Sequence, residues 1–262
     1  MNDGHKIGLA LGSGGARGLA HIGVLKALEE HDIKIDMISG CSAGALVGGL
    51  YCCGISPKMI ADIAFQLDMK TWVDLTVPKK GFIKGEKIQE IVKLLTRCRN
   101  IEDLKIPFTA ISTDLKVGQR YIFNKGPLYR AIRASISVPG VFEPLRMGNK
   151  VLVDGAVIDR VPASVVKGMG SDIVIAVDVG FGAPQGKINH IIDVMLQSID
   201  VMSRQISKRS FIKADILLEP SLTHIGGTKF NLVDECVEIG YNTTIEKIDE
   251  IKGLLNEKNY AI

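Results

Sequence analysis

The sequence has few aromatic residues, few histidines and no regular cysteine pattern. Aromatic residues make up 5% of its 262 residues, with one tryptophan and five histidines. The five cysteines are odd in number, show no CxxC spacing and lack a cluster of histidines that could complete a metal site. These features argue against a disulfide framework and against a zinc site. We expect reduced thiols in a cytoplasmic protein that needs no metal and no other cofactor.

The sequence also lacks a strong excess of charge of either sign. Its 32 lysines and arginines stand against 29 aspartates and glutamates, and the net charge of +3 comes from scattered residues. This distribution argues against nucleic acid as a partner. A net charge of +3 would not repel an anionic membrane surface, so the sequence is compatible with peripheral membrane contact.

Long hydrophobic runs are scarce as well. Residues 37–57 carry no charge and are long enough to cross a bilayer, but five glycines, at positions 40, 44, 48, 49 and 54, leave little apolar surface. We expect a buried strand, a turn and a helix there instead of a membrane span. No basic region with a long apolar stretch and a cleavage site follows Met1, so no signal peptide is expected.

Strand-like and helix-like segments alternate along the chain, which predicts parallel strands joined by right-handed crossovers. Strands are expected at residues 6–11, 37–40, 107–113, 120–123, 150–153, 172–179 and 216–218. Helices are expected at residues 18–31, 43–53, 57–68, 85–97, 127–137, 188–214 and 233–258. The β-branched segment 172–179 predicts a central strand covered on both faces. We expect one domain over residues 1–262, with a motif-bearing core at about 6–180 and C-terminal helices at about 188–258.

The stretch GCSAG places Ser42 between Gly40 and Gly44, after a predicted strand and before a predicted helix. A nucleophile on such a tight turn has a strained backbone and an exposed hydroxyl, and the flanking glycines remove side chains that would collide there. The dipole of the following helix favours negative charge nearby. We therefore predict that Ser42 is a nucleophile. An incidental serine in a glycine-rich turn is the alternative.

The glycine-rich stretch LGSGGARG, residues 11–18, lies between a predicted strand and a predicted helix, where backbone amides can converge on an anion. The dinucleotide fingerprint GxGxxG fits imperfectly, because Arg17 stands at the third glycine, and no GK[ST] follows. An oxyanion hole needs only amide donors beside the nucleophile, and adjacent parallel strands would place this loop next to Ser42. We favour the oxyanion hole over a nucleotide site or a plain turn.

The base that would activate Ser42 is not an obvious histidine. Only His190 and His224 follow the order of an α/β-hydrolase triad, and one begins a predicted helix while the other lies in a predicted surface loop. Asp154 is the stronger candidate, because it ends an apolar strand and Gly155 follows it. With an ordinary pKa of about 3.9 an aspartate is a weak base, so we expect burial to raise its proton affinity. An aspartate that opens a turn is the alternative.

The motifs GSGGARG, GCSAG and DGA, in this order, resemble the patatin-like phospholipase family. The resemblance is closest to its bacterial cytoplasmic members related to the catalytic domain of neuropathy target esterase. It covers residues 6–179 and includes RASISVPGVFEP, residues 133–144. The sequence departs from the family pattern at Ser13, where the family often has glycine, and at Ala156, which replaces the second glycine of DGG.

The resemblance implies a three-layer α/β/α sandwich with a mainly parallel central sheet, the patatin-like (FabD/lysophospholipase-like) fold. It also implies hydrolysis of lipid acyl esters by a Ser42–Asp154 dyad without histidine. The implied oxyanion hole is formed by backbone amides of Gly14, Gly15, Ala16 and Arg17.

Our hypothesis is therefore a serine acyl hydrolase of esterase, phospholipase or lysophospholipase type, which acts through an acyl-enzyme. A nucleotide-binding regulatory module is the alternative, and a degenerate lipid-binding adaptor is disfavoured because both Ser42 and Asp154 are present. Segment 188–214 carries five apolar side chains at helical spacing, for which we expect core packing rather than a lipid or dimer face: Ile191, Met195, Ile199, Met202 and Ile206. Segment 71–85 is either a lid at a bilayer or an ordinary loop.

Overall fold

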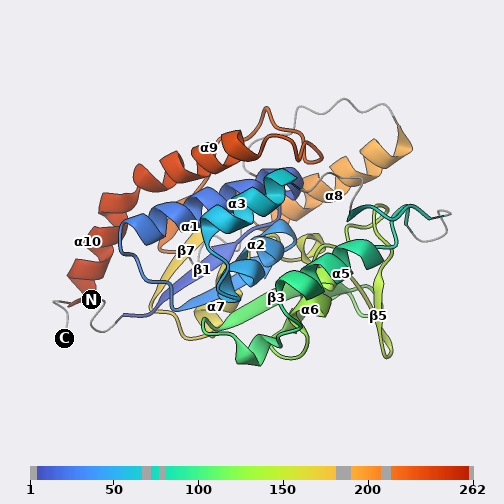
Figure 1. Cartoon of the computed structure of the whole chain (residues 1–262), viewed down its shortest axis with the longest axis horizontal. Coiled ribbons are helices and arrows are strands. Elements are labelled where there is room, and N and C mark those ends of the chain that lie inside the picture. The colour runs from blue at the N-terminus through green and yellow to red at the C-terminus, as the bar shows by residue number, and fades with distance from the viewer. Residues whose placement is uncertain (1–4, 67–71, 77–80, 181–189, 208–213, 260–262) are drawn as a thin grey trace.

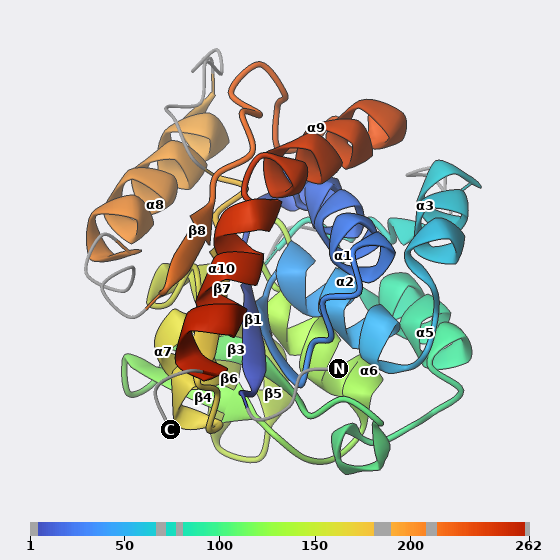
Figure 2. The same ribbon diagram turned by 90° about the vertical axis from the view of Figure 1, so that its left-hand side faces the viewer.

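The computed structural model describes residues 5–66, 72–76, 81–180, 190–207 and 214–259, which form an eight-stranded sheet with helices on both faces (Figures 1 and 2). The strand order is β5-β6-β3-β2-β1-β7-β8, and β4 pairs with β3. The strands are β1 Ile7–Leu11, β2 Met37–Cys41, β3 Phe108–Asp114, β4 Gln119–Phe123, β5 Leu145–Met147, β6 Lys150–Asp154, β7 Ile173–Val177 and β8 Ile216–Leu218.

The strands that precede the two glycine-rich motifs are parallel neighbours. β3, β2, β1, β7 and β8 run in the same direction, as the alternation of strands and helices predicts. Leu11 on β1 lies opposite Gly40 on β2, and Cys41 lies opposite Ile111 on β3. The carboxyl ends of these strands therefore meet at one edge of the sheet, where the glycine loop and the turn at Ser42 follow.

Helices cover both faces of this mixed sheet. Figure 2 shows α1, α2 and α6 on one side and α7 and α8 on the other. The helices are α1 Ala20–Glu30, α2 Ala43–Cys52, α3 Pro57–Gln66, α5 Glu86–Leu95, α6 Leu128–Ser135, α7 Ala163–Gly168, α8 Ile191–Ser207, α9 Val233–Ile245 and α10 Ile248–Asn259. Three short 3₁₀ turns are η1 Gly15–Leu19, η2 Ile101–Asp103 and η3 Gly155–Val157.

Alternate residues of β1 point into two different cores, because side chains alternate between the faces of a strand. Leu9 and Leu11 join the larger core with the helices of one layer. Ala10 joins a smaller core with Val174 and with Val166 of α7. Every residue of β1, β2, β3 and β7 is buried, as expected for strands that helices cover on both faces.

Three expectations about individual elements need correction. β7 is buried throughout as predicted, but it lies between β1 and β8 near one edge of the sheet and is not central. The expected helix 233–258 is two helices, α9 and α10. The hydroxyls of Thr243 and Thr244 bond back to the carbonyls of Ile239 and Gly240 just before the break, an arrangement that bends helices.

The third correction concerns α8, which covers residues 191–207 of the expected helix 188–214. The expected core packing is wrong for four of the five side chains, because Ile191, Met195, Met202 and Ile206 are between 43% and 76% exposed, whereas Ile199 is half-buried. Residues 188–189 and 208–213 lie outside the described residues. In segment 71–85, for which the sequence leaves both a lid and an ordinary loop open, Leu75 and Ile83 form an antiparallel bridge and Trp72 contacts Phe230 edge-on, with ring centroids 5.3 Å apart. Residues 71 and 77–80 of that segment also lie outside the described residues.

Candidate active site

Ser42 lies on a strained turn between β2 and α2. Its backbone has φ of 54° and ψ of −119°, a region that side-chain-bearing residues rarely adopt. The two flanking positions, Gly40 and Gly44, have no room for a side chain. A Cβ on Gly44 would lie 2.2 Å from the carbonyl oxygen of Leu11, and one on Gly40 would lie 2.5 Å from that of Gly44. The turn thus packs against the end of β1.

Ser135, at the end of α6, supports the turn from the other side. Its Oγ accepts a hydrogen bond from the backbone N–H of Ser42 at 2.9 Å and donates to the carbonyl of Ile111 at 2.6 Å. Two residues further on, the carbonyl of Ser137 accepts a hydrogen bond from the N–H of Asp154 at 2.9 Å. One short segment therefore positions both candidate catalytic residues. The sequence signal for it was the stretch RASISVPGVFEP, but nothing in that stretch singled out Ser135.

Asp154 reaches the same sheet edge as Ser42 by a route that the sequence did not predict. We expected it at the carboxyl end of a parallel strand, but β6 is antiparallel to β3. Asp154 pairs with Ser112, next to Ile111, which pairs with Cys41. The antiparallel strand brings its last residue level with the turn at Ser42.

The carboxylate of Asp154 is buried and only half satisfied. Oδ1 accepts a hydrogen bond from the N–H of Ala156 at 2.8 Å and a weak one from the Cys41 thiol at 3.8 Å. Oδ2 has no hydrogen-bond partner among the described residues. Burial raises the pKa of Asp154 to about 6, although the nearby Ser42 side chain, among other groups, opposes that shift. The Ser42 hydroxyl therefore lies near the carboxylate without a hydrogen bond to Oδ2.

The glycine loop lies between β1 and η1 and is fixed at both ends. The N–H groups of Gly12 and Ser13 donate to the carbonyls of Val177 and Arg160, each at 3.0 Å. The buried His21 bonds through Nε2 to the carbonyl of Gly12 at 2.8 Å. Burial lowers the pKa of His21 to about 4, so this ring is neutral and serves the loop as a hydrogen-bond donor.

The four residues expected to line an oxyanion hole have different surroundings. The N–H of Ala16 already donates to the carbonyl of Gly227 at 2.8 Å, so it is not available to a substrate in this conformation. Gly15 has φ of 58°, and a Cβ on Gly14 would lie 2.4 Å from Val179. No hydrogen bond from the N–H of Gly14 or Gly15 occurs within the described part of the chain. Arg17 is buried, and its Nε and Nη1 have no hydrogen-bond partner there.

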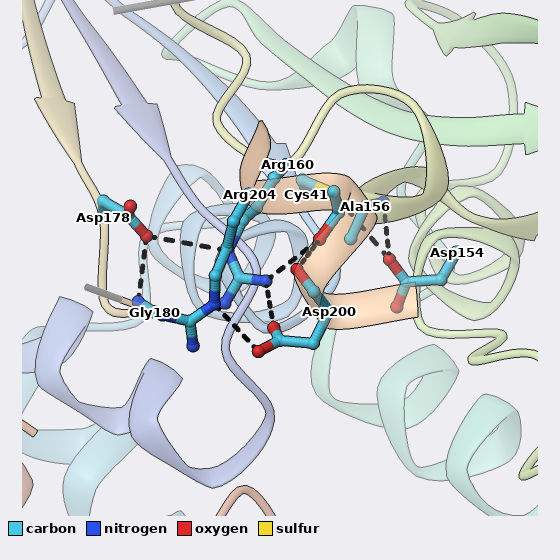
Figure 3. Close-up of polar contacts among 9 residues, drawn as sticks. Cys41, Asp154, Ala156, Arg160, Asp178, Gly180, Asp200 and Arg204 are labelled. Atoms are coloured by element: carbon cyan, nitrogen blue, oxygen red, sulfur yellow. Dashed lines mark hydrogen bonds and ion pairs between the residues drawn. The ribbon is translucent and has the colours of Figure 1, made fainter. Parts of the chain in front are cut away.

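Arg160, which follows η3, is the centre of a cluster of buried and half-buried charges, which Figure 3 shows. Nη1 of Arg160 lies 2.6 Å from Oδ1 of Asp200, and its Nε lies 3.6 Å from Oδ1 of Asp178. Nε of Arg204 lies 2.8 Å from Oδ2 of Asp200. Burial lowers the pKa of Arg17, and the nearby positive charge of Arg160 lowers it further. Arg160 connects α8 to the glycine loop. Its side chain pairs with Asp200 of α8, and its backbone carbonyl accepts a hydrogen bond from the N–H of Ser13.

The histidines that follow Ser42 in sequence have other surroundings. His224 bonds through Nε2 to Oε1 of Glu235 at 2.8 Å on the surface, as the predicted surface loop implies. His190 is exposed just before α8. Neither Ser42 nor Asp154 has a histidine among its described hydrogen-bond partners. Over the described residues no group of three histidine, cysteine, aspartate or glutamate side chains could hold a metal ion.

Comparison with known proteins identifies the family. Residues 9–167 match the patatin-like phospholipase family, and the chain therefore belongs to it. It is 42% identical over 175 residues to an uncharacterized NTE family protein of Mycobacterium tuberculosis, covering 66% of this chain and 48% of that protein. It is 37% identical over 185 residues to neuropathy target esterase of Drosophila melanogaster, covering 68% of this chain and 13% of that protein. The chain thus spans about half the length of these relatives or less.

Solved structures confirm the fold class. VipD from Legionella pneumophila aligns with a TM-score of 0.65 at 14% identity, over 94% of this chain and 67% of that one. The type III effector protein ExoU aligns with a TM-score of 0.52 at 13% identity, over 94% of this chain and 53% of that one. At these identities the likeness concerns the fold alone. Among the described residues no helix is long and apolar enough to cross a membrane.

Proposed function

We propose that this chain is a serine acyl hydrolase of the esterase, phospholipase or lysophospholipase type, with Ser42 as nucleophile and Asp154 as base. The observation that carries the proposal is the pairing of a serine on a strained turn with a buried carboxylate whose Oδ2 has no described partner. Family membership and the names of the relatives, which include an esterase, support a lipid acyl ester as substrate. The five free cysteines support our expectation of a reducing, cytoplasmic compartment.

In acylation, the Ser42 oxygen attacks the ester carbonyl carbon while Oδ2 of Asp154 takes the hydroxyl proton. The carbonyl oxygen becomes an oxyanion, which the N–H groups of Gly14 and Gly15 stabilise. The intermediate then expels the alcohol, which takes the proton from Asp154, and an acyl-Ser42 ester remains. A pKa of about 6 makes Asp154 a stronger base than an ordinary aspartate while leaving it mostly ionised at neutral pH.

In deacylation, Asp154 takes a proton from a water molecule as that water attacks the acyl carbon. The same amides stabilise the second oxyanion. When this intermediate collapses, the carboxylic acid leaves and Ser42 recovers its proton from Asp154. Both half-reactions therefore use one carboxylate, one hydroxyl and one set of amides, and every proton that Asp154 accepts is returned.

The proposal is tested by labelling with a fluorophosphonate and by turnover of a short-chain nitrophenyl ester. We expect Ser42 to be labelled, and we expect Ser42→Ala and Asp154→Asn to lose activity by a factor on the order of 10³ or more. His190→Ala and His224→Ala serve as controls that should keep activity. Labelling at another residue, or a folded histidine variant without activity, would contradict the dyad. Saturable binding of ATP or NAD that Gly14→Val abolishes, without labelling, would instead favour the nucleotide module.

A further inference from the structure

The outer face of α8 is apolar and carries no charge among its described residues. The exposed apolar side chains of this face, here called the α8 face, are Ile191, Val194, Met195, Val201, Met202 and Ile206. At 100° per residue these six positions fall on one side of the helix. The other described exposed positions on that side are Ser198 and Gln205, and the Ser198 hydroxyl bonds to the carbonyl of Val194 in its own helix.

The charged residues of α8 whose side chains are described point toward the protein instead. The Asp200 carboxylate accepts hydrogen bonds from Arg160 and Arg204. Ser203, on the same side of the helix, is only 2% exposed. A helix on the surface of a globular protein normally has its apolar side inward and its charges in water. In α8 this order is reversed, because the ion pair between Asp200 and Arg160 faces the segment that follows η3, whereas the apolar side chains remain outside. A contiguous apolar face of this kind marks a contact surface.

We propose that the α8 face contacts a phospholipid bilayer. Its described side chains are aliphatic residues and methionines, and the two polar residues on that side, Ser198 and Gln205, carry no charge. An uncharged aliphatic surface suits the boundary between head groups and acyl chains. The net charge of +3 does not oppose contact with anionic lipid.

The position of the α8 face relative to the candidate active site supports the same partner. Arg160, which anchors Asp200 of α8, lies just after η3, the turn that begins next to Asp154. Figure 3 draws these ion pairs and Asp154 in one view, and the positive charge of Arg160 is close enough to oppose the rise that burial causes in the pKa of Asp154. A bilayer in contact with α8 would therefore lie near the catalytic groups, which is where a lipid ester would have to enter. This step rests on the proposed function, whereas the apolar face itself does not.

The test uses the full chain and vesicles of diether phosphatidylcholine and phosphatidylglycerol, which contain no carboxylic ester to hydrolyse. We expect the protein to cosediment with them and Met195→Glu/Met202→Glu to lower the bound fraction about tenfold or more, because two carboxylates would enter the interface. The matched control is Met59→Glu/Leu94→Glu, which places the same charges at exposed apolar positions on α3 and α5. This control should bind like the unmodified protein.

Melting temperature shows whether each variant is folded, and the neutral pair Met195→Gln/Met202→Gln provides a second, milder disruption that should also weaken binding. Equal binding by all folded variants, or no binding by the unmodified protein, would overturn the proposal. So would a dimer, detected by light scattering, that the α8 variants convert to a monomer, because the face would then be buried between copies. Fluorophosphonate labelling is read separately, so failure of the surface and failure of the hydrolase are distinguishable.

Discussion

The chemistry proposed for this chain depends on the environment of one carboxylate. Asp154 is almost fully buried, its Oδ1 is held by the N–H of Ala156 and by the Cys41 thiol, and its Oδ2 has no hydrogen-bond partner among the described residues. Burial favours the protonated form, and the hydrogen bonds favour the ionised form. The balance places the pKa at about 6, so this carboxyl can exchange protons near neutral pH.

This balance predicts an acidic limb in the pH profile of ester hydrolysis. The reaction needs ionised Asp154, so kcat/KM should be full above the pKa and should fall as pH drops through about 6. Cys41→Ala removes a donor to the carboxylate and should move the limb to higher pH. Cys52→Ala, at a buried cysteine of α2, is the matched control and should leave the limb in place. A limb near the ordinary aspartate pKa would mean that another group controls the rate.

At the scale of elements, the turn at Ser42 depends on a partner far away in the sequence. Ser135 lies 93 residues later in the sequence. Its hydroxyl accepts a hydrogen bond from the N–H of Ser42 and donates one to the carbonyl of Ile111 on β3. The turn at Ser42, β3 and the end of α6 are therefore joined through one hydroxyl group. Because all three partners are buried, water cannot easily replace that hydroxyl.

Removal of this hydroxyl should lower both activity and stability. Ser135→Ala leaves a buried donor and a buried acceptor unpaired, which costs about 1–3 kcal/mol of unfolding free energy. We also expect a lower kcat for a soluble ester, since the turn loses its support. Ser198→Ala is a control, because that exposed hydroxyl bonds only within its own helix. Urea unfolding and initial rates measure the two effects, and an unchanged kcat would show that the turn keeps its shape without Ser135.

The comparison of sequence and structure is most informative at this scale. The buried strands and the two glycine-rich turns could be predicted, because local apolar pattern and glycine spacing report them directly. Strand β5 and helix α7, with three and six residues, were too short to show a period. The antiparallel direction of β6, the contact from Ser135 and the engaged amide of Ala16 depend on long-range contacts, which no local pattern records.

At the scale of the whole molecule, α9 packs on α1, and Gly227 and Cys236 contact the glycine loop. Gly23 of α1 and Gly240 of α9 allow the two backbones to approach, since a Cβ on Gly240 would lie 2.1 Å from the carbonyl of Ala20. The Sγ of Cys236 lies 3.9 Å from the carbonyl of Ala16. Ala16 is therefore held at its N–H by Gly227 and at its carbonyl by α9.

Gly240→Val should therefore destabilise the protein. The added side chain collides with backbone that cannot move aside, so we expect a loss of about 1–3 kcal/mol or more of unfolding free energy. Gly253→Val is the matched control, because it makes the same exchange inside α10 where nothing lies within 4 Å of the new Cβ. Thermal and denaturant unfolding measure the free energy of unfolding of the two variants. Equal values would mean that α1 and α9 can move apart without loss of stability.

The hydrogen bond from Ala16 to Gly227 has a consequence for work with fragments. The family match ends at residue 167, yet the loop beside the nucleophile is supported by residues 227 and 236. A minimal fragment cut to the matched region would carry every signature motif and lose the two contacts that hold Ala16 in the glycine loop.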